Sequence, residues 1–137
     1  MTFHTKSIAD WQEEVTEWAR GKGWPMKSTP QKPRTEEILA KIALAHSELS
    51  EAAECVRDGE YRMTGGKPDN AITVRRGKKL VEVRGPLSKP EGAVTEFADT
   101  IIRILHICGE LDLPLEEAMR IKMEFNRQRP YKHGRKA

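Results

Sequence analysis

Apolar residues recur at helical spacing in four stretches of the chain, and segments rich in glycine, proline or charge separate these stretches. Residues three, four and seven positions apart share one face of a helix, so this spacing predicts amphipathic helices. The predicted helices cover residues 7–19, 35–58, 89–111 and 112–127. Ser7 with Asp10, Ser88 with Glu91, and Asp112 are residues of the types that begin helices.

Each predicted helix carries an apolar face, which we expect to be buried in a shared core. The residues of these faces are Ile8, Trp11, Val15 and Trp18; Ile38, Ile42, Ala45, Leu49, Ala52 and Val56; Val94, Phe97, Ile101, Ile104, Leu105 and Cys108; and Leu115, Ala118, Ile121 and Phe125. The pattern predicts an all-α fold with a four-helix core.

The helical pattern is interrupted between the second and third helices, over residues 59–87. β-Branched residues alternate in Ile72–Arg75 and Leu80–Arg84 around Gly77, which predicts a short, basic β-hairpin. About 30 residues cannot build a core alone. We therefore expect the hairpin to be an insertion in a single domain of residues 1–137 that ends in a basic tail, residues 128–137.

The net charge of +3 conceals a strong segregation, because acidic and basic segments alternate along the chain. Trp18–Arg34 contains five basic residues and no acid. No stretch approaches the roughly 18 apolar residues of a membrane span, and the first ten residues lack the apolar core of a secretory signal. We expect a cytoplasmic protein with no membrane partner, in which Cys55 and Cys108 are buried free thiols; a disulfide between them is the less favoured alternative.

Two predicted helices each present a pair of acids three residues apart. The pairs are Glu48 with Glu51 and Glu96 with Asp99, and each pair lies on one side of its helix. If the helices pack antiparallel, the carboxylates converge, and such a cluster needs cations to remain ionised. Oxygen ligands without histidine or cysteine favour Mg²⁺, or Mn²⁺, over zinc and copper. Taken singly, such pairs are also common on solvated helix surfaces.

Three segments resemble the MazG-like all-α NTP pyrophosphatases: Leu44–Glu51 (LAHSELSE), Lys89–Arg103 (KPEGAVTEFADTIIR) and Lys122–Gly134 (KMEFNRQRPYKHG). The resemblance implies a Mg²⁺-dependent hydrolase that cleaves nucleoside triphosphates to the monophosphate and pyrophosphate. It also implies that Glu48, Glu51, Glu96 and Asp99 are the metal ligands and catalytic residues. The sequence does not say which carboxylate accepts a proton from the attacking water.

The resemblance further implies that Lys122 and Asn126 bind substrate phosphates, and Arg129 follows them just beyond the same helix. Lysine and arginine suit phosphate oxygens. Arg103 either neutralises the carboxylates or contacts a phosphate. Trp24, in the basic loop, is a candidate for stacking on a base.

The chain departs from the family pattern in two places. Ser47 stands where many members have a second acid before the first motif glutamate, and the hairpin lengthens the interval between the two acidic pairs. Neither departure removes a proposed ligand. The wide apolar faces predict a homo-oligomer, a dimer or a tetramer.

Two other functions are compatible with parts of the sequence. The basic hairpin and tail could belong to a nucleic-acid-binding helical module in which the acids are structural, although we do not expect nucleic acid as the main partner. A redox protein with a carboxylate-bridged metal pair would need Glu-x-x-His pairs, which the third and fourth predicted helices lack.

Overall fold

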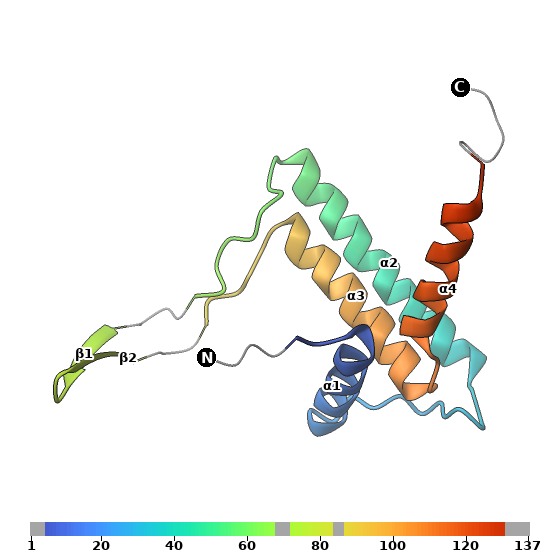
Figure 1. Ribbon diagram of the computed structural model, residues 1–137, viewed down its shortest axis with the longest axis horizontal. Coiled ribbons are helices and arrows are strands. Elements are labelled where there is room, and N and C mark those ends of the chain that lie inside the picture. The colour runs from blue at the N-terminus through green and yellow to red at the C-terminus, as the bar shows by residue number, and fades with distance from the viewer. Residues whose placement is uncertain (1–4, 68–71, 84–86, 131–137) are drawn as a thin grey trace. The chain divides into compact units, whose positions relative to one another are not determined.

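The structure is a computed structural model that describes residues 5–67, 72–83 and 87–130. These residues form the helices α1 (Ile8–Gly21), α2 (Thr35–Arg57), α3 (Ala93–Glu110) and α4 (Leu115–Gln128), and the strands β1 (Ile72–Arg76) and β2 (Lys79–Val83) (Figure 1). The four helices confirm the all-α prediction. The chain divides into two compact units, residues 1–42 with 102–137 (the first unit) and residues 43–101 (the second unit).

The first helix begins where the sequence predicts it to begin. The Ser7 hydroxyl accepts a hydrogen bond from the backbone N–H of Asp10 at 3.0 Å, and the Asp10 carboxylate accepts one from the N–H of Ser7 at 2.9 Å. This reciprocal pair is a capping box, and it satisfies two backbone donors that the helix itself cannot satisfy.

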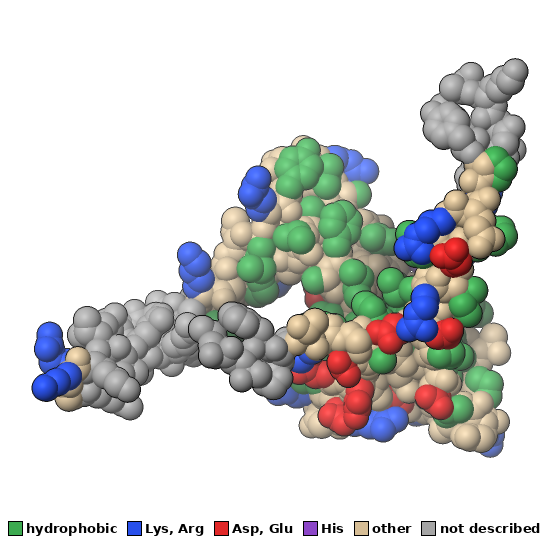
Figure 2. All heavy atoms as spheres, in the orientation of Figure 1, with side chains coloured by type: hydrophobic (Ala, Val, Ile, Leu, Met, Phe, Trp, Pro, Cys, Tyr) green, Lys and Arg blue, Asp and Glu red, His purple; other side chains and the backbone are tan. Residues whose placement is uncertain are grey.

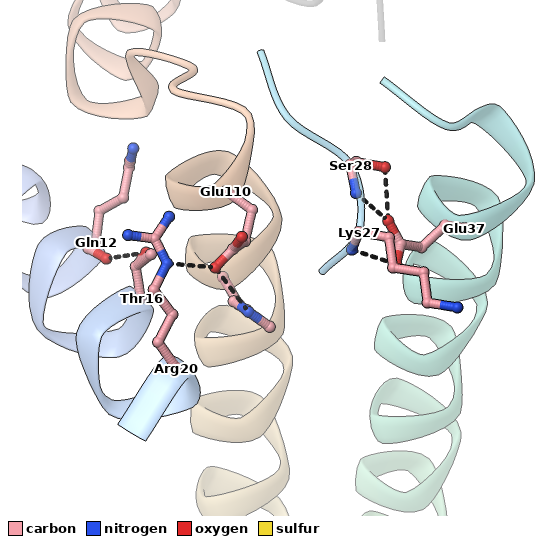
Figure 3. A network of polar contacts seen from close by, with 8 residues as sticks. Gln12, Thr16, Arg20, Lys27, Ser28, Glu37 and Glu110 are labelled. Carbon is pink, nitrogen blue, oxygen red and sulfur yellow. Dashed lines mark hydrogen bonds and ion pairs between the residues drawn. The ribbon is translucent and has the colours of Figure 1, made fainter. Parts of the chain in front are cut away.

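In the first unit, α1 packs against the last turn of α3 and the start of α4. The Gln12 side-chain amide donates to the Leu113 carbonyl at 3.0 Å. A Cβ atom added to Gly109 would collide with the Thr16 hydroxyl, so glycine allows the two helices to approach closely. The Thr16 hydroxyl itself donates to the Gln12 carbonyl at 2.7 Å (Figure 3).

The start of α3 differs from the prediction. Glu91 and Thr64 exchange backbone hydrogen bonds of 2.9 and 3.0 Å, as paired strands do. Ser88 donates to the Lys67 carbonyl through its N–H at 2.8 Å and through its hydroxyl at 3.1 Å. The predicted capping box of Ser88 and Glu91 is therefore wrong, because both residues pair with the segment that follows α2, and α3 begins only at Ala93.

The start of α4 also differs. Asp112 adopts a left-handed conformation with φ of 52°, and its N–H donates to the Gly109 carbonyl at 3.3 Å. The N–H of the next residue, Leu113, donates to the Cys108 carbonyl at 2.8 Å. Asp112 thus closes the C-terminus of α3, where left-handed residues are common. The prediction that it caps the fourth helix is wrong, and α4 begins at Leu115.

β1 and β2 are antiparallel, with Val74 opposite Val81 and Arg76 opposite Lys79. Gly77 lies in the turn with φ of 63°, a conformation that glycine adopts without steric cost. The pair occupies the segment in which the sequence predicts a hairpin. Arg84, the last residue of that predicted hairpin, lies outside the described residues.

Burial is shallow. Among the residues whose burial the structure describes, the buried apolar ones are Val15, Ala19, Met26, Ala45, Ala52, Ala93, Leu105, Ile107 and Cys108. Both cysteines are free, as predicted; Cys108 is buried, but Cys55 is only half-buried, so the predicted burial holds for Cys108 alone. None of the described helices has the length and apolar character needed to cross a membrane.

Many large side chains assigned to the predicted core are exposed in the single chain. They are Trp11, Trp18, Ile42, Leu49, Val56, Val94, Phe97, Ile101, Ile104, Ile121 and Phe125. In α2 the buried positions are alanines, and a helix that packs through alanines leaves the longer side chains beside the contact line outside. In α4 no described residue is buried. The prediction that these side chains fill the core of one chain is wrong.

Candidate metal centre

The second unit holds the C-terminal part of α2 beside the N-terminal part of α3 (Figure 1). Backbone hydrogen bonds tie the two helix ends together: the N–H of Ala93 donates to the Glu60 carbonyl at 2.8 Å, and the N–H of Val94 donates to the Tyr61 carbonyl at 3.1 Å. The end of one helix therefore meets the start of the other, and the two run antiparallel. This is the arrangement in which the two acidic pairs can converge.

Three of the four predicted ligands come together. One carboxylate oxygen from each of Glu48, Glu96 and Asp99 lies within 4.8 Å of the other two, and all three side chains are half-buried. Glu51 is exposed and lies outside this triad, although it is close enough to act electrostatically on Glu96. We call Glu48, Glu96 and Asp99 the acidic triad.

The carboxylate of Glu96 is strongly perturbed. Its pKa is raised to about 7, first by burial, then by hydrogen bonding to Glu48 and Glu51, and then by the negative charges of Glu51 and Asp99. Two carboxylates hydrogen-bond only when one of them is protonated, so these contacts favour the neutral acid. In addition, Oε2 of Glu96 is buried and has no hydrogen-bond partner within the described residues.

These features fit a hard divalent cation. The triad offers carboxylate oxygens from two helices, and it includes neither histidine nor cysteine. Cys55 lies one turn beyond Glu51 on the same helix, but burial raises the pKa of its thiol and so disfavours the thiolate that zinc would need. An orphaned carboxylate oxygen beside two further acids is the donor set that Mg²⁺ or Mn²⁺ would complete.

The predicted substrate-binding residues all belong to the first unit. The Lys122 ammonium lies 4.9 Å from the centroid of the Phe125 ring, and the Arg129 guanidinium lies 5.7 Å from the same centroid. The N–H of Arg129 donates to the carbonyl of Asn126 at 3.3 Å. The three predicted phosphate ligands therefore gather at the C-terminal end of α4.

Arg103 and Trp24 lie elsewhere in the first unit. Arg103 is half-buried on α3, and Trp24 is exposed in the loop between α1 and α2. Contact between any of the five predicted substrate ligands and the carboxylates of the second unit stays a prediction.

Glu110 is a buried carboxylate that was not predicted from the sequence as a candidate site residue. Its side chain is only 4% exposed, and Arg20 Nε and His106 Nε2 lie 3.3 and 3.6 Å from its Oε1 (Figure 3). Burial is the largest cause that lowers the pKa of His106. The spacing of His106 and Glu110, four residues apart on one helix, is the signal that could have indicated this pair. The ion pair of Glu110 with Arg20 of α1 indicates a structural role.

The comparisons with known proteins give no relative for this chain: no protein-family model matches it, and no match was found among curated proteins or solved structures. The functional argument therefore depends on the residues and their geometry.

Proposed function

We propose that this protein is a Mg²⁺-dependent nucleoside triphosphate pyrophosphohydrolase of the MazG-like type, with the hairpin as an insertion in that fold. The observation that carries the proposal is the convergence of Glu48, Glu96 and Asp99 within 4.8 Å, with a buried Glu96 oxygen that lacks a partner among the described residues. Groups that only maintain a fold are usually hydrogen-bonded when buried. Glu110 Oε1 also has no hydrogen bond within the described residues, but the Arg20 cation lies 3.3 Å from it, whereas the partnerless Glu96 oxygen is accompanied by two further acids, which supports a cation as its partner.

The acidic triad would hold the metal, with Mn²⁺ as a possible substitute for Mg²⁺. When bound, the ion supplies charge neutralisation for the triphosphate and a lowered pKa for a bound water. The reaction itself is the in-line attack of water on the α-phosphorus, which breaks the bond to the bridging oxygen between the α- and β-phosphates. The products are the nucleoside monophosphate and pyrophosphate.

The protein's own side chains then have separate tasks. If Glu48, Glu96 and Asp99 hold the ion, the carboxylate left to accept a proton from the attacking water is that of Glu51, the most exposed of the four. Lys122, Asn126 and Arg129 provide donors for phosphate oxygens at the end of α4. Arg103 and Trp24 are the remaining proposed contacts, with a phosphate and with the base.

A homo-oligomer is part of this proposal. Hydrophobic side chains gather on the visible face of α2 and α3 in the second unit (Figure 2). The exposed large hydrophobic residues of α2 and α3 in the second unit are Leu44, Leu49, Val56, Val94, Phe97 and Ile101. A large apolar surface of this kind is commonly covered by another protein chain. Sedimentation equilibrium at micromolar concentration should show a dimer or tetramer, and a single 15.6 kDa species would contradict it.

The activity is tested with a panel of NTPs and dNTPs incubated with the protein and Mg²⁺. Monophosphate and pyrophosphate are quantified separately, because equal amounts of both identify cleavage between the α- and β-phosphates. Release of orthophosphate, or turnover that persists in EDTA, would refute the assignment.

Glu54→Gln is the matched control for carboxylate variants. Glu54 lies three residues beyond Glu51 on α2, is exposed and is not part of the triad. We expect Glu54→Gln to retain full turnover. Glu51→Gln should lower the turnover number while leaving Mg²⁺ affinity nearly unchanged, whereas Glu48→Gln should lower both.

A further inference from the structure

The first unit contains a loop between α1 and α2 that carries cations and no acid. We call residues 22–34 the cationic loop. Its charged residues are Lys22, Lys27, Lys32 and Arg34, and all four side chains are exposed. Such a surface favours an anionic partner.

Hydrogen bonds and burial hold the cationic loop in one conformation although it contains no helix or strand. The Glu37 carboxylate accepts hydrogen bonds from the N–H groups of Lys27 and Ser28 at 2.8 and 2.7 Å and from the Ser28 hydroxyl at 2.6 Å (Figure 3). The Ser28 hydroxyl also accepts from the N–H of Arg34 at 3.0 Å. Ser28 is 1% exposed and Met26 6%, so both anchor the loop from within.

The cations of the loop are not used to stabilise the fold. Within the residues that the structure describes, none of the four forms an ion pair. Arg120 on α4 behaves differently, since its guanidinium lies 2.5 Å from the Glu117 carboxylate. Arg20, just before the loop, is likewise engaged with Glu110. The loop therefore offers its positive charge to solvent.

Two tryptophans stand at the same loop. The rings of Trp18 and Trp24 meet edge to face, with centroids 5.5 Å apart and planes at 80°. The N–H of Trp24 donates to the Ala19 carbonyl at 2.8 Å, which fixes the backbone of the loop to the end of α1. Nevertheless, Trp18 remains 48% exposed and Trp24 58% exposed. Large aromatic rings that are ordered but exposed are suited to stacking on a ligand.

We propose that the cationic loop, with Trp18 and Trp24, binds single-stranded nucleic acid. Aromatic faces that stack on unpaired bases, combined with cations that follow the phosphate backbone, are the features by which proteins bind single strands without sequence preference. In a duplex the bases are stacked on one another inside the helix, so they are not available to stack on the two tryptophans. A membrane surface fits less well, because Met26 is the one long aliphatic side chain of the loop and it is buried.

The test uses the full-length protein in EDTA, so that metal-dependent nucleotide binding does not contribute. Binding of a fluorescent oligothymidylate of about 12 nucleotides is followed by anisotropy over a range of salt concentrations. We expect Trp24→Ala to weaken binding about tenfold at fixed salt, and Trp24→Phe to restore most of the loss. The double variant Lys27→Gln/Lys32→Gln should reduce the slope of log affinity against log salt by about 1.4, or about 0.7 per phosphate contact.

Removal of two cations elsewhere supplies the matched control. Arg75→Gln/Lys78→Gln removes the same charge from the hairpin and should change the salt slope less than the loop variant does. The Lys27 substitution leaves the anchor of the loop intact, because Glu37 binds the backbone N–H of Lys27 and not its side chain.

Several outcomes would overturn the proposal. They are equal effects of the loop and hairpin variants, no detectable binding at low salt, and binding to anionic lipid vesicles in place of the oligonucleotide. Because the measurement is made without Mg²⁺, its failure leaves the proposed hydrolase untouched, and loss of the hydrolase activity leaves this binding untouched.

Discussion

Two glutamates in the first turns of helices differ strongly in their acidity. Glu37 lies in the first turn of α2 and Glu96 in the first turn of α3. The pKa of Glu37 is lowered to about 2, chiefly by the Ser28 hydroxyl and the Lys27 N–H that donate to it. The pKa of Glu96 is raised to about 7 by burial and by the surrounding acids. The helix dipole favours a negative charge at both positions, so it does not explain the difference.

The difference lies in what surrounds each carboxylate. Glu37 accepts three hydrogen bonds and joins a loop to a helix, so its charge is already satisfied by the fold. Glu96 has a buried oxygen without a partner in the described part of the chain, and three further acids act on it. A carboxylate of the first kind stabilises structure. A carboxylate of the second kind is a candidate for binding a cation.

The largest effect that we expect is on catalysis. Glu48→Gln, Glu96→Gln and Asp99→Asn should each lower Mg²⁺-dependent pyrophosphate release by a factor on the order of 10² or more, because each removes charge that a metal site requires. Replacing Glu37 by glutamine should leave turnover of the remaining folded protein near that of the wild type. Full turnover in any of the three triad variants would contradict the distinction between a metal-binding Glu96 and a structural Glu37.

Local structure was largely predictable from the sequence. The capping box of Ser7 and Asp10 depends on residues three positions apart, and the structure contains it. The spacing of Glu96 and Asp99 likewise placed both on one side of α3, and the structure brings them together with Glu48. Such features follow from helix geometry alone, without knowledge of the neighbouring elements.

Features that depend on distant partners were not predictable. Ser88 and Glu91 have the spacing of a capping box, but Lys67 and Thr64 compete for them through pairing of the chain segments on either side of the hairpin. The apolar faces of the helices were recognisable from the sequence. Periodicity does not tell whether another helix of the same chain or a second chain covers such a face. Glu37 has no sequence signal comparable to an acidic pair, because its three donors come from a loop nine and ten positions earlier.

The second effect concerns stability in the presence of metal. A ligand that binds only the folded state stabilises it by about 2.7 kcal/mol at one hundred times its dissociation constant. Mg²⁺ should therefore raise the unfolding midpoint of the wild type and of Glu54→Gln, and it should have little effect on Glu96→Gln. Thermal melts with Mg²⁺ and with EDTA measure this directly. An equal shift in all three proteins would show that the ion does not bind through Glu96.

The third effect concerns the structural glutamate and its partner. Ser28→Ala removes a buried hydroxyl that donates to Glu37 and accepts from the N–H of Arg34. Losing a hydrogen bond to a charged group and leaving a buried donor unsatisfied should cost about 1–3 kcal/mol of the free energy of unfolding. Urea denaturation checks the value. An unchanged midpoint would mean that the anchor of the cationic loop contributes nothing to stability.

The smallest effect concerns pH, and here the two glutamates act in opposite directions. The folded-state pKa of Glu96, about 7, lies above the ordinary glutamate value of 4.5, so its contribution to stability is present below pH 4.5 and is lost as the pH rises from 4.5 through 7. The folded-state pKa of Glu37, about 2, lies below 4.5, so its contribution is present above pH 4.5 and is lost as the pH falls toward 2.

Metal-free denaturation curves of the wild type, Glu96→Gln and Glu37→Gln separate these two windows. Relative to the wild type, Glu96→Gln should gain stability as the pH rises from 4.5 to 7, and Glu37→Gln should lose its disadvantage as the pH falls from 4.5 to 2. Burial lowers the pKa of the half-buried His106 below its ordinary value, but this residue is present in all three proteins and its contribution cancels in the differences. If both variants differed from the wild type by a constant amount at every pH, the two carboxylates would not have the opposite environments that distinguish a binding site from a structural anchor.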